Sequence, residues 1–185
     1  STTTNSIRFV WESTIQRLLD MPPGTMESFH LQELEQCIKH CTSNDNTCYF
    51  YGFDLLDRLE EEILVLRREN QDYQNENLLM MATDILNEER VASVVHQWRK
   101  IIRQCQQSNN TYNHILVLSP EQVLERIESY FSQSRLNKQS LIPIYNLVLD
   151  AMAYYYQQSP KQAARKIMKL LQLIEQLQSI TPTTP

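Results

Sequence analysis

The sequence predicts an all-α protein built from stacked antiparallel helical hairpins, and three observations lead to that fold class. The chain has 185 residues but only two glycines, Gly24 and Gly52, so few positions favour the turns of a β-fold. Apolar residues recur at spacings of three and four in several long segments, the period of a helix buried on one face. The helix start SPEQVLERI at 119–127 also returns as SPKQAARKI at 159–167, which indicates a repeated helix–turn–helix unit.

Three helices are expected in the first 70 residues. The apolar stripe of 7–20 ends before a Pro-Pro-Gly turn, and the helix of 28–41 begins with Ser28 as its cap and ends at a polar SNDN turn. The third helix covers 52–70, where Leu and Ile follow the same spacings. Fewer than three heptads follow this pattern, so we expect a packed helix with one buried face rather than a coiled coil. The polar stretch NQDYQNEN at 70–77 is expected to be a linker.

The C-terminal half is expected to contain five more helices, with a break or cap at Asn87. Ser-Pro pairs at 119 and 159 place a hydroxyl cap before a proline at the first helical position. The apolar HILVL at 114–118 has no partner strand and is expected to be a loop or a helix margin. The expected bounds are 78–88, 89–105, 119–133, 140–157 and 159–180.

These helices group into hairpin-like units within one helical-repeat domain over 1–185. A partial copy supports the grouping, since LLDRLE at 55–60 matches VLERIE at 123–128 in the character of each position. The expected units are 7–42, 48–69 with 78–88, 89–133 and 140–181, with the linker at 70–77.

Charge divides the chain into two halves. Residues 1–90 contain 7 Lys and Arg residues and 17 Asp and Glu residues, a net charge of −10. Residues 91–185 contain 10 Lys and Arg residues and 5 Asp and Glu residues, a net charge of +5. The acidic half should repel phosphate, whereas the basic half could attract it. No apolar run is long enough to cross a membrane, so we expect no membrane insertion. The cysteine spacing does not suggest disulfide staples, which favours a reducing compartment.

The sequence does not predict an enzyme, and no cofactor is expected. Two glycines cannot form a glycine-rich phosphate loop, and the acidic run Glu60-Glu61-Glu62 is expected to be a solvated helix face. One weak metal-like cluster exists, with spacings that fit none of the usual zinc patterns. The histidines without a neighbouring catalytic pattern are His30, His96 and His114. The cluster comprises Cys37, His40, Cys41 and Cys48.

Residues 141–182 resemble a pentatricopeptide repeat. The first helix opens with Tyr145-Asn146 and continues to Asp150-Ala151, a second helix contains Ala163-Ala164, and Pro182 closes the unit. The unit is longer than usual for the family and is similar to those of divergent organellar members found in algae. The match of 89–133 is looser, and residues 7–69 share only the alternation of helices and turns that is typical of hairpins. The resemblance implies a right-handed solenoid in a mitochondrion or chloroplast, although no targeting peptide is visible.

The same resemblance implies binding to single-stranded RNA or to a ribonucleoprotein assembly. In this family the Asn after the Tyr of the first helix reads a base, which points to Asn146, and the second base-reading position would be Thr183. Phosphate contacts are expected from the basic residues of the preceding first helix. These candidates are Arg90, Arg99, Lys100 and Arg103.

Two alternatives stay open. The chain could be a generic helical-repeat or bundle protein, or a structural subunit whose hairpins contact other protein subunits in a large organellar complex. Tyr154, Tyr155 and Tyr156 are interface candidates, because three consecutive residues of one helix cannot all face the core.

Overall fold

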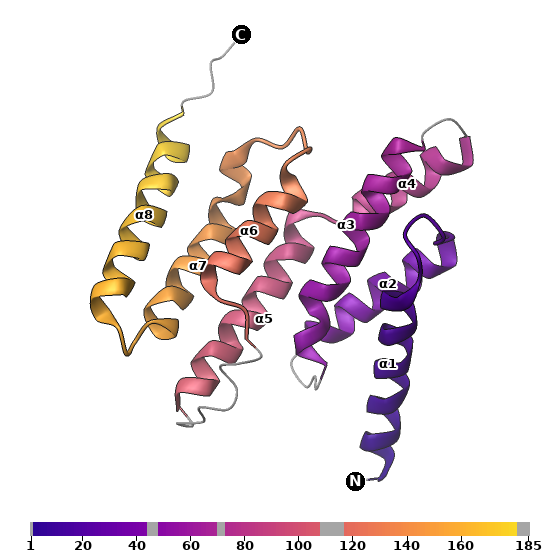
Figure 1. Cartoon of the computed structure of the whole chain (residues 1–185), viewed down its shortest axis with the longest axis horizontal. Coiled ribbons are helices and arrows are strands. Elements are labelled where there is room, and N and C mark those ends of the chain that lie inside the picture. Colours follow the sequence, from indigo (N-terminus) through magenta and orange to yellow (C-terminus); the bar gives the residue numbers. More distant parts are fainter. Residues whose placement is uncertain (1, 44–47, 70–72, 108–116, 181–185) are drawn as a thin grey trace. The chain divides into compact units, whose positions relative to one another are not determined.

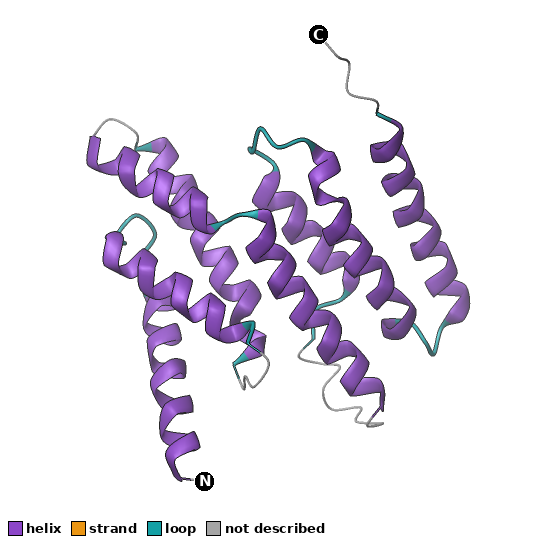
Figure 2. Cartoon of the chain, turned by 180° about the vertical axis from the view of Figure 1, so that it is seen from behind, coloured by secondary structure: helices purple, strands orange, loops and turns teal. Residues whose placement is uncertain are grey.

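The structure is a computed structural model that describes residues 2–43, 48–69, 73–107 and 117–180. Over these residues the chain is all-helical and has no strand, which confirms the expected class (Figures 1 and 2). Short 3-10 turns precede two of the α-helices, at Tyr49–Tyr51 and Lys138–Leu141. The α-helices are α1 (Thr2–Asp20), α2 (Ser28–Cys41), α3 (Gly52–Arg68), α4 (Tyr73–Ile85), α5 (Glu88–Gln107), α6 (Pro120–Phe131), α7 (Ile142–Tyr155) and α8 (Pro160–Ser179).

The helices form two compact units, Ser1–Val94 and Val95–Pro185, with the boundary inside α5. In the first unit α1 packs on α2, α2 on α3 and α3 on α4. In the second unit α6 packs on α7 and α7 on α8. Neighbours in sequence are therefore neighbours in space, as expected of helical hairpins. The right-handed solenoid and the single domain over 1–185 stay predictions. No helix in the described ranges is long and apolar enough to span a membrane.

The core of the first unit lies among α1, α2 and α3. The predicted stripe of α1 is only half buried, because Ile15 and Leu18 are inaccessible to solvent whereas Ile7 and Val10 are exposed. The stripes of α2 and α3 are buried along most of their length. The largest fully buried side chains of this unit are Ile15, Leu18, Leu31, Leu34, Ile38, Leu55, Leu56 and Leu59.

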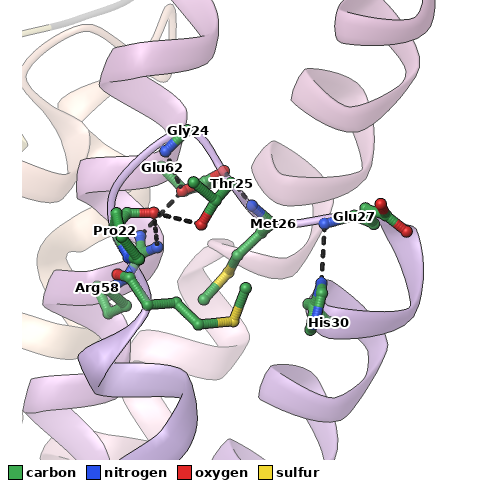
Figure 3. Close-up of polar contacts among 9 residues, drawn as sticks. Pro22, Gly24, Thr25, Met26, Glu27, His30, Arg58 and Glu62 are labelled. Atoms are coloured by element: carbon green, nitrogen blue, oxygen red, sulfur yellow. Dashed lines mark hydrogen bonds and ion pairs between the residues drawn. The ribbon is translucent and has the colours of Figure 1, made fainter.

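A buried ion pair on α3 binds the loop between α1 and α2 (Figure 3). Glu62 and Arg58 are 0% and 4% exposed, and Arg58 Nη1 lies 3.0 Å from Glu62 Oε2. Glu62 also accepts hydrogen bonds from the backbone N–H groups of Gly24 and Met26, at 2.8 and 3.1 Å. Arg58 donates to two backbone carbonyls of the same loop, at 3.2 and 3.1 Å. The expectation that Glu60-Glu61-Glu62 forms a solvated face is therefore wrong at Glu62.

Gly24 shows why this loop needs a glycine. Its φ is +85°, a left-handed conformation that other residues adopt at a cost, and a Cβ there would lie 2.8 Å from Val65. The conformation points the Gly24 N–H at Glu62 (Figure 3). The Pro-Pro-Gly signal in the sequence therefore marks a turn that α3 holds in place.

Three helix starts differ from the sequence expectation. Helix α1 begins at Thr2 rather than at residue 7. At α2 the residue before the first turn is Glu27 rather than Ser28, and its N–H donates to His30 Nδ1 at 3.0 Å (Figure 3). Helix α4 begins at Tyr73, so most of the expected linker 70–77 is helical. Once later turns of α4 are anchored by Ala82 and Ile85, adding a polar turn at its start costs little.

The two copies of the repeated Ser-Pro helix start make different hydrogen bonds. The Ser119 hydroxyl accepts from the Gln122 N–H at 3.3 Å, and the Gln122 side chain accepts from the Ser119 N–H at 2.9 Å, a reciprocal capping box. Ser159 also precedes a proline at the first helical position, but its side chain makes no capping hydrogen bond. The repeated Ser-Pro pair therefore marks two helix starts that both have Pro at the first helical position, but only the first of them has a side-chain cap.

The core of the second unit lies among α5, α6, α7 and α8. Trp98 on α5 is 5% exposed and its Nε1–H donates to the Leu118 carbonyl at 2.9 Å, which fixes the chain entering α6. Most of HILVL at 114–118, which was expected to be a loop or a helix margin, lies outside the described residues. Other buried side chains of this unit include Val123, Ile127, Ile144, Tyr145, Val148, Met152, Leu170 and Ile174.

Candidate nucleic-acid interface

A surface of the second unit combines basic residues of α5 with polar and aromatic residues of α7. Arg99 and Arg103 lie one turn apart on α5, and both donate to Asp150 Oδ2, at 3.2 and 2.6 Å. The Arg103 guanidinium also lies over the Tyr154 ring, 4.9 Å from its centroid. Asp150 therefore orients two guanidinium groups at once.

Asn146 belongs to the same stripe of α7. It precedes Asp150 by four residues, and Tyr154 follows Asp150 by four, so the three side chains lie on one face of the helix. Asn146 is exposed and Tyr154 is 38% exposed. We call these residues with Arg99 and Arg103 the α5–α7 surface.

His96 precedes Arg99 on α5 by about one turn. It is exposed, and its Nδ1 lies 3.4 Å from Arg99 Nη2. Arg99 and Arg103 both contact Asp150, and Arg103 also lies over the Tyr154 ring, so side chains of α5 and α7 meet along this stretch.

The electrostatic environment of this surface is positive. Partial burial and then the charges of Arg99, Lys100 and Arg103 lower the pKa of His96. These three cations make the potential at His96 positive, and a neutral imidazole keeps one hydrogen-bond donor and one acceptor. The arrangement can attract phosphate and present a flat aromatic ring with an amide on the neighbouring turns.

The structure separates Arg90 from the other three predicted phosphate ligands. Arg90 lies in the first unit and pairs with Glu35 at 2.8 Å, and Lys39 lies 3.4 Å from the same carboxylate. Burial raises the pKa of Glu35, but hydrogen bonds and charges from Arg90 and Lys39 outweigh it and lower the pKa. Arg90 is therefore part of an ion-pair cluster within its own unit.

The three tyrosines have distinct roles. Tyr154 faces the α5–α7 surface, whereas Tyr156 is bound by side chains from α6 and α8. The Tyr156 hydroxyl donates to Glu121 and accepts from Lys166 Nζ at 2.8 Å, and Lys166 lies 2.7 Å from Glu121. Burial and the hydrogen bond to Glu121 raise the pKa of Tyr156 to about 12. Tyr155 packs edge-on against Tyr156, with ring centroids 4.9 Å apart.

The cysteine cluster packs in the core. Cys37, Cys41 and Cys48 are all buried, and burial raises the pKa of Cys37 to about 11, so its thiol stays protonated near neutral pH. The His40 ring stacks on Trp11 with centroids 4.2 Å apart and planes 7° apart. Over the described ranges, no group of three or more His, Cys, Asp or Glu side chains could hold a metal ion.

Sequence reasoning missed two parts of this surface. Asp150 pairs with two arginines, although the sequence suggested only that it belongs to the repeat pattern, and His96 showed no catalytic neighbour. The four-residue spacing of Asn146, Asp150 and Tyr154 was the available signal for a shared face. The other base-reading candidate, Thr183, lies outside the described residues.

No protein-family model, curated protein or solved structure matches this chain. The structure itself defines the class: an all-helical protein of helical-repeat-like character, with sequential helices packed on one another. A closer assignment depends on the residue pattern of 141–182 and on the α5–α7 surface.

Proposed function

We propose that the chain binds single-stranded RNA through the α5–α7 surface. The observation that supports this most directly is the combination of Arg99, Lys100 and Arg103 with an exposed Asn146 and a half-exposed Tyr154 on neighbouring helices. RNA-binding surfaces join cations for the phosphates to aromatic rings for the bases, and this surface has both.

Each group has a chemical role in the proposal. Arg99, Lys100 and Arg103 bind phosphate oxygens, and Asp150 holds the guanidinium groups of the two arginines in position. Tyr154 stacks on a base, and the Asn146 carboxamide donates to and accepts from a base edge. In this proposal Asn146 has the base-reading role that the resemblance to pentatricopeptide repeats implies. By the same resemblance we propose that the protein acts in a mitochondrion or chloroplast.

The charge distribution limits the proposed site to one part of the chain. The acidic half has a balance of −10 and repels a polyanion, whereas the basic half has +5. Two hairpins contact only a few nucleotides, so the proposed binding has modest affinity and weak sequence selectivity.

Fluorescence anisotropy with labelled single-stranded RNA tests the proposal. We expect binding at low salt that weakens as salt rises. The logarithm of the binding constant should fall with the logarithm of the salt concentration with a slope of about −2, the value for three phosphate contacts. Arg103→Ala should weaken binding and reduce the slope. The matched control is Arg68→Ala, which removes an exposed cation of α3, and should change neither. Low affinity that stays unchanged from low to moderate salt would contradict the proposal.

A scaffold role is the second candidate, and an exposed apolar surface in the first unit favours it. Ile7, Phe9 and Val10 of α1 and Phe29 of α2 are each at least half exposed. Exposed apolar residues that lie close together commonly mark protein contacts.

A further inference from the structure

The carboxylate of Asp150 makes the contacts that a phosphate group would make at the α5–α7 surface. A single oxygen, Oδ2, accepts from Arg99 Nη1 at 3.2 Å and from Arg103 Nη2 at 2.6 Å. A phosphate oxygen placed between two guanidinium groups accepts hydrogen bonds of the same kind. Asp150 therefore fixes the two arginines and at the same time uses donors and positive charge that a phosphate needs.

The other donors of the two arginines do not remove this competition. The Nε atoms of Arg99 and Arg103 are buried, and they have no hydrogen-bond partner in the part of the chain that the structure describes. A guanidinium binds a phosphate bidentately either through Nε and one Nη or through both Nη atoms. Because each Nε is buried, a bidentate contact must use the Nη atom that already donates to Asp150.

The stacking position of the same surface is also partly occupied. The Arg103 guanidinium lies over the Tyr154 ring, 4.9 Å from its centroid, so the contact with Asp150 and the contact with the ring involve the same side chain. When a phosphate draws Arg103 away from Asp150, it also changes the cover of the ring on which a base would stack. The phosphate donors and the aromatic ring are therefore coupled through Arg103.

The ion pairs are exposed enough for a polyanion to displace Asp150. The Asp150 and Arg103 side chains are 40% and 39% exposed, and Arg99 is 20% exposed. Ion pairs in contact with water contribute little to stability, so the Asp150 carboxylate can turn to solvent at small cost. A strand with several phosphates gains more from the three cations of α5 than an isolated phosphate does.

We propose that Asp150 is an internal competitor of RNA phosphate. In the free protein it occupies the donors of Arg99 and Arg103, and in the complex a phosphate takes its place. The contact is autoinhibitory, because it lowers the affinity of the α5–α7 surface and favours strands over isolated phosphate groups. This inference rests on the proposed RNA-binding function.

Asp150→Asn separates the charge of this residue from its hydrogen bonds, because the amide oxygen still accepts from both arginines. We expect the variant to bind single-stranded RNA about three- to fivefold more tightly than wild type at low salt. The gain should disappear at high salt, where charges near the surface are screened. The matched control is Glu175→Gln, which removes one exposed negative charge from α8 of the same unit and should change the affinity little. Circular dichroism verifies that the variants stay folded.

A second background tests whether Asp150 acts through the arginines. In a chain with Arg99→Ala and Arg103→Ala, adding Asp150→Asn should give no gain, because the competing contacts are already absent. A gain of the same size in this background would show a general effect of charge and would overturn the proposal.

Titration with inorganic pyrophosphate, followed by NMR, tests the competition without RNA. Pyrophosphate should bind Asp150→Asn more tightly than wild type. If RNA binds neither protein while pyrophosphate still prefers the variant, the RNA-binding proposal fails and the competition stands. The competition is overturned if RNA binds wild type and Asp150→Asn equally, if Glu175→Gln gives the same gain, or if neither ligand binds either protein.

Discussion

At the scale of single residues, the two sides of α7 differ in exposure and in the contacts they make. Asn146, Asp150 and Tyr154 form an exposed stripe next to the arginines of α5, whereas Tyr145 and Val148 are buried. Tyr156, at the end of the helix, is bound by Glu121 and Lys166 instead. The role of each tyrosine is therefore set by its contacts rather than by its presence in a run of three.

The stripe gives a prediction for RNA binding. Tyr154→Ala should weaken binding to every RNA by about 1–3 kcal/mol through lost stacking, with the salt slope unchanged. Asn146→Ala should instead reduce discrimination among homopolymer RNAs with little loss of overall affinity. Anisotropy titrations with four homopolymers separate the two effects, and identical profiles for both variants would contradict these roles.

The Tyr156 cluster gives a prediction for stability. Tyr156→Phe removes the hydroxyl that donates a hydrogen bond to Glu121 and accepts one from Lys166. The free energy of unfolding, measured in urea at neutral pH, should therefore fall by about 1–2 kcal/mol. Tyr154→Phe is the matched control and should have little effect, since the contact with Arg103 involves the ring.

The pH dependence of this difference follows from the pKa shifts. The pKa of Tyr156 is raised, so its stabilising contribution is complete below pH 10 and is lost as pH rises through about 12. Burial raises the pKa of Glu121, but hydrogen bonds from Lys166 and Tyr156 lower it overall. The stabilising contribution of ionised Glu121 is therefore complete above about pH 4.5, and it is lost as pH falls through the lowered pKa of Glu121. A difference between wild type and Tyr156→Phe that stays constant from pH 3 to pH 12 would contradict the coupling.

At the scale of elements, the two Ser-Pro helix starts have the same letters but different bonds. Ser119 forms a capping box with Gln122, whereas Ser159 forms no capping bond. Ser119→Ala should therefore destabilise the protein by about 1 kcal/mol, and Ser159→Ala by much less. Thermal unfolding of both variants measures the difference, and equal losses would show that the two starts are equivalent in solution.

The buried pair on α3 is the other feature at this scale. Glu62→Gln leaves the Arg58 guanidinium buried without a counter-charge, so we expect a loss of about 3–5 kcal/mol. Adding Arg58→Met to Glu62→Gln should recover part of that loss, because the remaining buried charge is then removed. Chemical denaturation of both single variants and the double variant completes the cycle. Strictly additive losses would contradict direct coupling of the two side chains.

At the scale of the whole molecule, charge asymmetry predicts where RNA makes contact. Ultraviolet crosslinking to single-stranded RNA, followed by mass spectrometry, should identify peptides from residues 95–185, including Tyr154. Peptides from residues 1–94 should be rare, because the balance of −10 in the acidic half repels phosphate. Crosslinks concentrated in the acidic half would contradict the proposed location.

The sequence predicted the all-α class and most helix positions correctly, because apolar periodicity and helix-start chemistry are local properties. It placed the C-terminal end of α1 and both ends of α3 within two residues of where they lie, and it expected α6 and α8 to start at their Ser-Pro pairs. It missed the start of α1, which lies at Thr2 rather than at residue 7. It was wrong at the start of α4, where packing of later turns extends a polar segment into the helix.

The candidate site was only partly predictable. Arg99, Lys100 and Arg103 were expected as phosphate contacts and Asn146 as a base reader, but the contacts of Arg99 and Arg103 with Asp150 and Tyr154 depend on the register of α5 against α7. That register arises from packing between helices about 50 residues apart in the chain, which no local pattern encodes.

By itself, then, the sequence determined that this chain is helical, where most of its helices begin and how charge divides its halves. Only the tertiary structure decided that Glu62 is buried with Arg58, that Asp150 orients two arginines, and that part of the α1 stripe stays uncovered. The physical reason is that periodicity specifies which face of a helix is apolar, whereas burial and charge pairing depend on which helix packs against that face.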